Sequence, residues 1–157
     1  MSLLCAIDTN VLWKANRSPA EQPRPGSEFA RRIRFLKAVR DGDVVVLISR
    51  MLLNEYMATL KKPVNDLVQL LLQLLVDPKP NRARINWKTP WSGRDRSAAR
   101  KCRYPKHDEH VLRTAMLENE QSWIATEEKP MLGTNACIYR RFRVHIRRPD
   151  QILAEIT

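Results

Sequence analysis

The sequence predicts an α/β protein in which helices cover both faces of a mostly parallel central sheet. Three apolar runs, at residues 3–7, 44–48 and 122–126, have the length and composition of buried strands. The segments between them repeat apolar residues at helical spacing. Because strands that alternate with helices form sheets sandwiched between helices, we expect a three-layer α/β/α fold.

The composition indicates one ordered domain with a polyanionic partner. The chain has 157 residues, of which 43% are hydrophobic and 29% charged, so we expect a single domain over residues 1–157. The formal net charge is +11 and the pI is about 10.1. Such an excess of positive charge favours a nucleic acid as the partner, and an anionic membrane surface second.

The cysteines and the start of the chain favour an intracellular protein. Cys5, Cys102 and Cys137 show no paired spacing, and Cys5 falls in a predicted buried strand. We therefore expect reduced thiols rather than a disulfide framework. The chain shows neither a cationic leader nor a long apolar segment, so we expect a cytoplasmic protein with no membrane partner.

The first strand and helix are separated by a loop. The strand at 3–7 leads into Asp8 and Thr9, which either cap a following helix or belong to a site at the end of the strand. A proline-rich loop is predicted over 13–26. It precedes a helix over 27–40, whose arginines we place on the face that points away from the core.

The strand at 44–48 is followed by two more predicted helices, at 50–61 and 66–76. Glu55 lies beside the apolar stripe of the first, either at its edge in water or in a site. The helix at 66–76 is apolar on almost every side. Such a helix is either enclosed in the core or covered by a second subunit, so a homodimer is one of the two expectations.

Residues 77–106 are predicted to be a basic surface insertion. Between residues 79 and 106 the chain has ten Lys or Arg and a single acid, Asp95. A loop of this kind either adds solubility or contacts RNA, with cations holding phosphates and aromatic rings stacking on unpaired bases. Tyr104 offers one such ring. The other residues assigned to RNA binding are Arg94, Arg96, Arg100, Lys101, Arg103, Trp87 and Trp91.

The last third of the chain supplies further acids. Asp108 begins a helix and heads its buried stripe, and Glu127 and Glu128 follow the strand at 122–126. The remaining predicted elements are a turn at 129–133, an edge strand at 143–146 and a terminal helix at 149–156.

Four carboxylates are predicted to meet at one edge of the sheet. Asp8 and Glu128 (or its neighbour Glu127) follow strands, while Glu55 and Asp108 lie on helices that pack on the sheet. Converging carboxylates repel one another unless cations are bound, and oxygen-only ligands suit Mg²⁺ or Mn²⁺ rather than zinc. Such ions can activate a water molecule against a phosphodiester.

The sequence around these acids resembles the PIN-domain superfamily, and within it the VapC-like toxin ribonucleases. The resemblance covers most of the chain except residues 13–26 and 77–106. The matching segments are Asp8-Thr9-Asn10-Val11-Leu12, Leu53-Asn54-Glu55, residues 107–115, Thr126-Glu127-Glu128 after a hydrophobic strand, and residues 144–153, which resemble the closing strand and helix.

The resemblance implies a PIN-like fold and a metal-dependent endoribonuclease. It implies that Asp8, Glu55 and Asp108 form the acidic core that binds Mg²⁺ or Mn²⁺. Thr126 resembles the hydroxyl beside the fourth acid, and Asn10 resembles the polar residue that steadies the first acid. Glu128 stands where the family usually has Asp, and its longer side chain puts the second metal position in question.

Two histidines near Asp108 leave alternatives open. His107 and His110 are either metal ligands at helical spacing, or exposed or supporting neighbours of the acids, and we favour the second interpretation.

We therefore expect a hydrolase that cleaves RNA phosphodiester bonds, for which the resemblance implies products with 5′-phosphate and 3′-hydroxyl ends. The resemblance also implies that the chain could be the toxin of a toxin–antitoxin pair with an antitoxin protein as partner. The alternative is a catalytically weak or inactive PIN-like module that binds RNA through its basic insertion. A membrane-surface role ranks third, because the basic stretch lacks an amphipathic apolar face.

Overall fold

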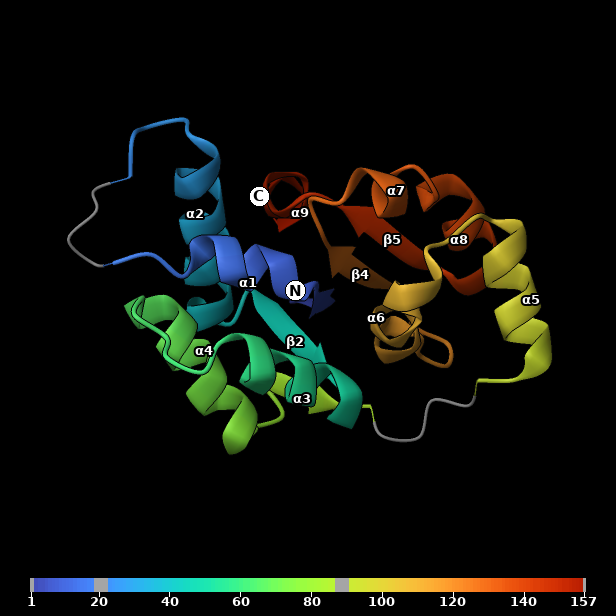
Figure 1. Ribbon diagram of the computed structural model, residues 1–157, viewed down its shortest axis with the longest axis horizontal. Coiled ribbons are helices and arrows are strands. Elements are labelled where there is room, and N and C mark those ends of the chain that lie inside the picture. The colour runs from blue at the N-terminus through green and yellow to red at the C-terminus, as the bar shows by residue number, and fades with distance from the viewer. Residues whose placement is uncertain (1, 19–22, 87–90, 157) are drawn as a thin grey trace.

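A computed structural model describes residues 2–18, 23–86 and 91–156 and places one parallel sheet at the centre of the molecule (Figure 1). The strands pair in the order β3-β2-β1-β4-β5, and every neighbouring pair is parallel. Their bounds are β1 (Leu3–Ile7), β2 (Val44–Ile48), β3 (Ala83–Ile85), β4 (Ser122–Ala125) and β5 (Val144–Arg147). The predicted α/β class and parallel sheet are confirmed.

Helices fill the intervals between the strands. In the first half they are α1 (Thr9–Ala15), α2 (Glu28–Asp41), α3 (Arg50–Thr59) and α4 (Asp66–Val76). In the second half they are α5 (Gly93–Lys101), a 3₁₀ turn (Lys106–Asp108), α6 (Glu109–Ala115), α7 (Lys129–Leu132), α8 (Asn135–Phe142) and α9 (Pro149–Ile156). Within the described ranges, no helix combines the length and the apolar character needed to cross a bilayer.

The helices form a layer on each face of the sheet. α2 packs against β2, α4 and α9, whereas α6 packs across β1 and β4 (Figure 1). The chain moves outward from β1 to β2 and β3, and then returns to β4 and β5 on the other side of β1. Because strand crossovers are right-handed, reversing the direction of travel moves the crossover helices to the opposite face. The result is a three-layer α/β/α fold.

The reversal creates a topological switch point between β1 and β4. Ile7 and Ala125 are level with each other at the C-terminal ends of these two strands. In open α/β sheets, ligands bind just outside the strand ends at such a point. Asp8 follows β1 directly and Thr126 follows β4, so both residues stand at the switch point.

Local sequence signals explain where the helices begin. Ser27, Ser49 and Asn65 each accept a hydrogen bond from a backbone amide in the first turn of α2, α3 and α4, respectively. Gly42 ends α2 with a φ of +86°, a conformation that residues with a Cβ rarely adopt. β2 is buried along its whole length, as a strand between two parallel neighbours should be.

Residues 77–106 differ from the long surface loop that the sequence predicts. β3 adds an edge strand beside β2, with Arg84 level with Leu47, and α5 follows it. The strand gives little sequence signal because it has three residues, of which only Ala83 is buried. In the same way α5 buries only Ala99, so it lacks an apolar stripe.

The start of the predicted loop at 13–26 also differs. α1 continues to Ala15, so residues 13–15 are helical, and the helix buries Val11, Leu12 and Ala15. α8, over Asn135–Phe142, is a further helix that the sequence pattern does not predict.

Cys102 and Cys137 form a disulfide, which corrects the expectation of reduced thiols. Cys102 follows α5 and Cys137 lies in α8, with their Cα atoms 5.5 Å apart. The pair is separated by 35 residues, and only the folding of α5 against α8 brings it together, so spacing alone gives no signal. Cys5 is a free, buried thiol, as predicted for a residue in a central strand.

Candidate acidic active site

Asp8 is the central acid of the switch point. The residue is buried, with 4% of its surface exposed. Thr126 donates a 2.8 Å hydrogen bond from Oγ1 to Asp8 Oδ2, and the same hydroxyl accepts a 3.1 Å hydrogen bond from Glu128 N. The Asp8 side chain makes no capping hydrogen bond to α1. The carboxylate is therefore held by Thr126, the residue after β4, and does not cap α1.

Glu55 extends from α3 toward α1 and α6. Thr9 donates a hydrogen bond from Oγ1 to Glu55 Oε1. On the other side, His110 Nε2 lies 2.6 Å from Glu55 Oε2. The Glu55 side chain is 37% exposed, so it lies at the rim of the site with one oxygen tied to the residue after Asp8.

Asp108 stands where the 3₁₀ turn meets α6. Buried Tyr104 donates a 2.8 Å hydrogen bond from its hydroxyl to the Asp108 carbonyl oxygen, which fixes the backbone at this junction. The Asp108 side chain is 18% exposed. His107 Nε2 lies 3.4 Å from Asp108 Oδ2, but the His107 side chain is 87% exposed. His107 and His110 are both placed as neighbours of acids.

The two glutamates after β4 have different partners. Glu127 accepts hydrogen bonds of 2.6 and 2.7 Å from the guanidinium group of Arg32, a buried residue of α2. Glu128 instead accepts a hydrogen bond from Asn10 Nδ2 on α1. Glu128 is therefore the acid beside Asp8, while Glu127 is neutralised by Arg32. Thr126 lies beside Glu128, as predicted, and also donates to Asp8, whereas Asn10 contacts Glu128 and not the first acid.

The surroundings of Asp8 oppose its charge. Burial raises the pKa of Asp8 from 3.8 to about 6, and the hydrogen bond from Thr126 acts against this rise. The charges of Asp108, Glu128 and Glu55 raise this pKa further. Asp108, Glu128 and Glu55 therefore all lie within electrostatic reach of Asp8.

Asp108 shares this environment. Burial raises the pKa of Asp108, and the nearby rings of His107 and His110 act against the rise. Glu55 and Glu128 raise the pKa further through their charges. The two rings therefore offset part of the repulsion on the Asp108 side of the cluster.

The chemistry of these donors fits a hard divalent cation. All four candidate ligands are carboxylates, and a bound cation would relieve the repulsion that raises the pKa of Asp8 and Asp108. Among residues 2–18, 23–86 and 91–156, no three His, Cys, Asp or Glu side chains are gathered around a common point as ligands. Glu55 and Glu128 accept hydrogen bonds from Thr9 and Asn10 instead.

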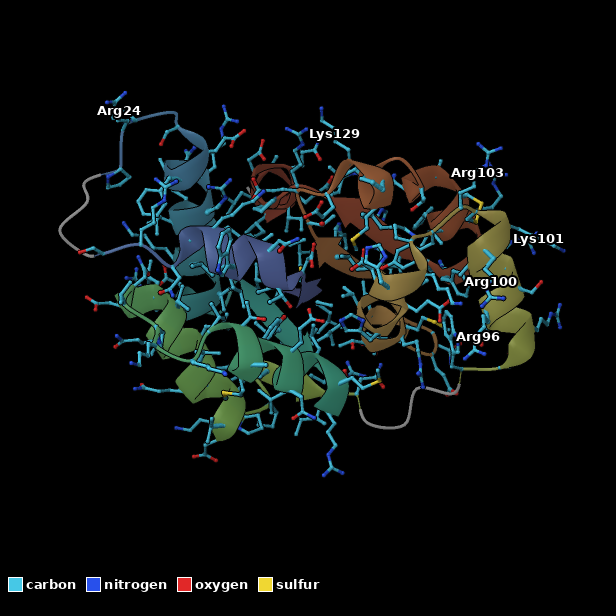
Figure 2. All side chains as sticks on the ribbon, in the orientation of Figure 1. Arg24, Arg96, Arg100, Lys101, Arg103 and Lys129 are labelled. Carbon is cyan, nitrogen blue, oxygen red and sulfur yellow. A yellow bond between two sulfur atoms is a disulfide. The ribbon has the colours of Figure 1, made fainter. Side chains whose placement is uncertain are left out.

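The cations assigned to RNA binding gather on α5 and on the turn after it. Figure 2 shows Lys101 and Arg103 extending outward from this edge of the molecule, with Arg96 and Arg100 beside them on α5. Arg96 Nε lies 3.8 Å from a carboxylate oxygen of Glu109, a loose ion pair. The basic segment is therefore an ordered helix that presents its charge to the surroundings.

A hollow lies between this helix and α8. Arg94 and Lys101 of α5 and Arg141 of α8 line it, and its volume is about 450 Å³. Asp95 is the one acid in its lining, so the hollow has a net positive wall.

The aromatic residues assigned to base stacking differ in their accessibility. Trp87 lies outside the described residues. Trp91 packs partly buried against the core, and the guanidinium carbon of Arg113 is 5.7 Å from its ring centre. Tyr104 is buried with 4% exposed, so the expectation that its ring stacks on RNA bases is wrong.

Arg32 and Thr9 support the site, although neither is predicted to belong to it from the sequence. Arg32 is expected among the outward-facing arginines of its helix, but it is 5% exposed. A signal was available, because Arg32 lies three residues after Phe29 and four before Leu36, on the apolar stripe of α2. A charge on such a stripe needs a buried partner. Thr9 gives no comparable signal, since a hydroxyl at a helix start is common.

Comparisons of the chain with protein-family models, with curated proteins and with solved structures give no match. The function is therefore inferred from the residues at the switch point and from their chemistry.

Proposed function

We propose that this protein is a PIN-like endoribonuclease that hydrolyses RNA phosphodiester bonds with Mg²⁺ or Mn²⁺. The observation that supports the proposal is the position of Asp8 at the switch point, where the charges of Asp108, Glu128 and Glu55 oppose its ionisation. Gathering carboxylates weakens a metal-free fold, and perturbed groups of this kind cluster at functional sites. A bound cation turns the same arrangement into a favourable one.

Each residue of the cluster has a role in the proposal. Asp8 and Asp108 are the more buried acids and would hold the cation directly, while Glu55 and Glu128 would complete its coordination from the rim. Thr126 fixes the orientation of Asp8 through its hydroxyl. When bound, the metal ion would activate water and offset charge on the phosphate.

The rest of the chain would bring RNA to the site. The formal net charge of +11 attracts a polyanion, and the cations of α5 give part of this charge a defined surface. The resemblance to VapC-like toxins extends the proposal to an antitoxin partner, a homodimer and a cytoplasmic location. The Cys102–Cys137 disulfide argues against the cytoplasmic part of this proposal, because reducing compartments keep most thiols unpaired.

A catalytically inactive RNA-binding module is the second candidate. The observation that favours it is that Glu55 and Glu128 already have donors, from Thr9 and Asn10. If these hydrogen bonds persist in the presence of metal, each of the two acids has fewer lone pairs left to coordinate it.

A cleavage assay distinguishes the two candidates. Mixed single-stranded RNAs are incubated with the protein in Mn²⁺, in Mg²⁺ and in chelator, together with the Asp8→Asn and Glu118→Gln variants. Glu118 is an exposed acid outside the cluster and serves as the matched control. The ribonuclease proposal predicts cleavage that requires metal, is abolished in Asp8→Asn and is kept in Glu118→Gln. Binding of RNA without cleavage in any metal would favour the inactive module.

A further inference from the structure

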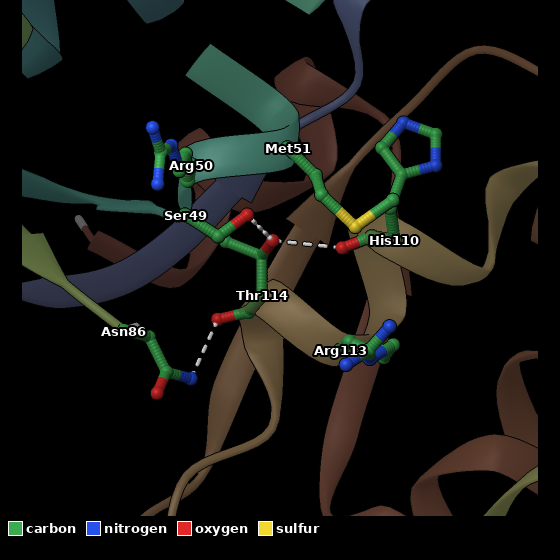
Figure 3. A pocket seen from close by; sticks show the side chains of 7 residues that line it. All are labelled: Ser49, Arg50, Met51, Asn86, His110, Arg113 and Thr114. Atoms are coloured by element: carbon green, nitrogen blue, oxygen red, sulfur yellow. Dashed lines mark hydrogen bonds between the residues drawn. The ribbon is translucent and has the colours of Figure 1, made fainter. Parts of the chain in front are cut away.

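A small pocket lies next to the acidic site, between the start of α3, the end of β3 and α6. Its volume is about 90 Å³, and Figure 3 shows the side chains that line it. This is well below the several hundred Å³ of pockets that enclose a nucleoside-sized ligand, yet it is enough for several water molecules. The size suits a single small group such as a phosphate.

The neutral polar groups of the pocket are already committed to one another. Ser49 and Thr114 share a 2.6 Å hydrogen bond between their hydroxyls, and Thr114 donates a 2.7 Å hydrogen bond to the carbonyl oxygen of His110. Asn86 uses its amide group to donate to the carbonyl oxygens of Thr114 and Met116, at 3.1 and 2.8 Å. These hydrogen bonds make the walls rigid and leave few neutral donors for a ligand.

The donors that remain belong to two arginines. In Figure 3, Arg50 and Arg113 stand on opposite sides of the pocket. Arg50 is exposed, and Arg113 is half-buried with its guanidinium group over Trp91. Among the described residues, neither arginine has a carboxylate within ion-pair distance. Two unpaired guanidinium groups beside a small hollow attract an anion, and their planar donors match phosphate oxygens.

His110 connects the pocket to the acidic site. His110 is one of the residues that line the pocket, and its Nε2 atom lies 2.6 Å from Glu55 Oε2. His110 is therefore shared by the pocket and the acidic site, so an anion in the pocket would lie near the carboxylates. Consecutive phosphates of a nucleic acid strand are anions that occur close together in this way.

We propose that this pocket binds the RNA phosphate next to the one that is cleaved, with Arg50 and Arg113 as its ligands. The proposal rests on the ribonuclease function proposed above and adds a substrate-positioning site to it. Because the pocket neutralises a phosphate and offers no free neutral donors to a base, it would hold RNA without regard to base identity.

The first arm of the test measures binding without cleavage. RNA binding is titrated in chelator with the Asp8→Asn protein as background, alone and combined with Arg50→Ala, Arg113→Ala or Arg34→Ala. Arg34 is an exposed residue of α2 and controls for the removal of one positive charge. Removing either pocket arginine should weaken binding about ten-fold and reduce the salt slope by about 0.7, whereas Arg34→Ala should change both much less.

Arg50 gives the cleaner variant of the two. It is exposed and unpaired among the described residues, so its removal leaves the packing of the fold intact. Arg113→Ala also removes the contact with Trp91, and Arg113→Lys restores the charge without the planar group. Partial recovery of binding in Arg113→Lys is expected, and equal binding by Arg50→Ala, Arg113→Ala and Arg34→Ala would overturn the pocket proposal.

The second arm locates the phosphate. After wild-type cleavage is mapped, two RNAs are made. One has a neutral methylphosphonate linkage on the 5′ side of the cleaved bond, and the other has it on the 3′ side. One of the two should raise KM about ten-fold for the wild type, but not for the Arg50→Ala/Arg113→Ala double variant. An equal effect on both proteins contradicts the pocket proposal and leaves the ribonuclease function standing. Absence of metal-dependent cleavage by the wild type overturns the ribonuclease function, and the pocket proposal with it.

Discussion

At the scale of single residues, Asp8 combines burial with a hydrogen bond from Thr126 and with the charges of three other acids. Near neutral pH the carboxylate is ionised although burial and its neighbours oppose its charge. Without a cation this arrangement weakens the fold. With a cation, the same charges become ligands, so metal binding and stability are coupled at this residue.

The metal-free protein should lose stability as the pH rises past the pKa of Asp8. The folded state raises this pKa from 3.8 to about 6, so the folded state binds the proton more tightly than the unfolded state. The stabilising contribution is therefore complete below 3.8 and disappears as the pH passes about 6.

The check compares melting temperatures of wild type and Asp8→Asn in chelator between about pH 4 and pH 7. The variant should melt higher than wild type near pH 7, and the difference should disappear near pH 4. A difference that does not vary with pH would show that Asp8 is not the group responsible.

Removing Arg32 should destabilise the protein through its partner Glu127. Arg32→Met leaves a carboxylate whose side chain is only 16% exposed without its two hydrogen bonds, at a cost of about 3–5 kcal/mol. Glu28→Ala serves as the matched control, because Glu28 also pairs with Arg32 but its side chain is 70% exposed. Chemical denaturation should show a large decrease in stability for Arg32→Met, little change for Glu28→Ala, and partial recovery when Glu127→Gln is added. No recovery in the double variant would mean that Arg32 acts through its packing alone.

At the scale of elements, the sequence predicts the strands and helices whose buried residues form a regular apolar pattern. The strands at Leu3–Ile7 and Val44–Ile48 and the helix at Asp66–Val76 have the predicted bounds, because their burial is visible as continuous or periodic apolar residues. β3 and α5 each bury a single residue, so the pattern that would reveal them is missing. Their formation depends on neighbours that are distant in sequence.

Two variants of α4 can distinguish a helix that packs only in the core from one that also forms a homodimer interface. Leu71 is buried in the core, whereas Leu74 is half-buried on the outer side of the helix. Leu71→Ala should cost about 2–5 kcal/mol in unfolding free energy, since it leaves a cavity. Leu74→Glu should leave the monomer folded, and if α4 forms a homodimer interface, light scattering should show dissociation. A wild-type protein that is monomeric at high concentration would remove the homodimer from the proposal.

The basic helix α5 should contribute to RNA binding through charge. Replacing Arg94, Arg96 and Arg100 with Ala should weaken binding and lower the salt slope by about 0.7 for every phosphate of a single strand that is no longer neutralised. Trp91→Ala should also weaken binding, because it removes the ring that lies under the guanidinium group of Arg113, one of the proposed phosphate ligands. A triple variant that binds and cleaves like wild type across a salt series would place the RNA elsewhere on the surface.

At the scale of the whole molecule, the topology gathers the candidate site. Asp8, Glu55, Asp108 and Glu128 could be proposed from the sequence because carboxylates that follow parallel strands or head packed helices converge at the switch point. Their partners could not all be proposed in this way. The bonds from Thr9 to Glu55, from Asn10 to Glu128 and from Arg32 to Glu127 join segments about 46, 118 and 95 residues apart, and no local pattern encodes them.

The central claim is that a divalent cation binds at these acids, and paramagnetic broadening of backbone NMR signals by Mn²⁺ tests it most directly. Titration of the wild type should broaden the amide signals around Asp8, Thr126 and Asp108 first, and leave those of α4 sharp. The Asp8→Asn variant should require far more Mn²⁺ for the same broadening, while the Glu118→Gln control should match the wild type. Broadening that is centred elsewhere, or that is unchanged in Asp8→Asn, would contradict a metal site at the switch point.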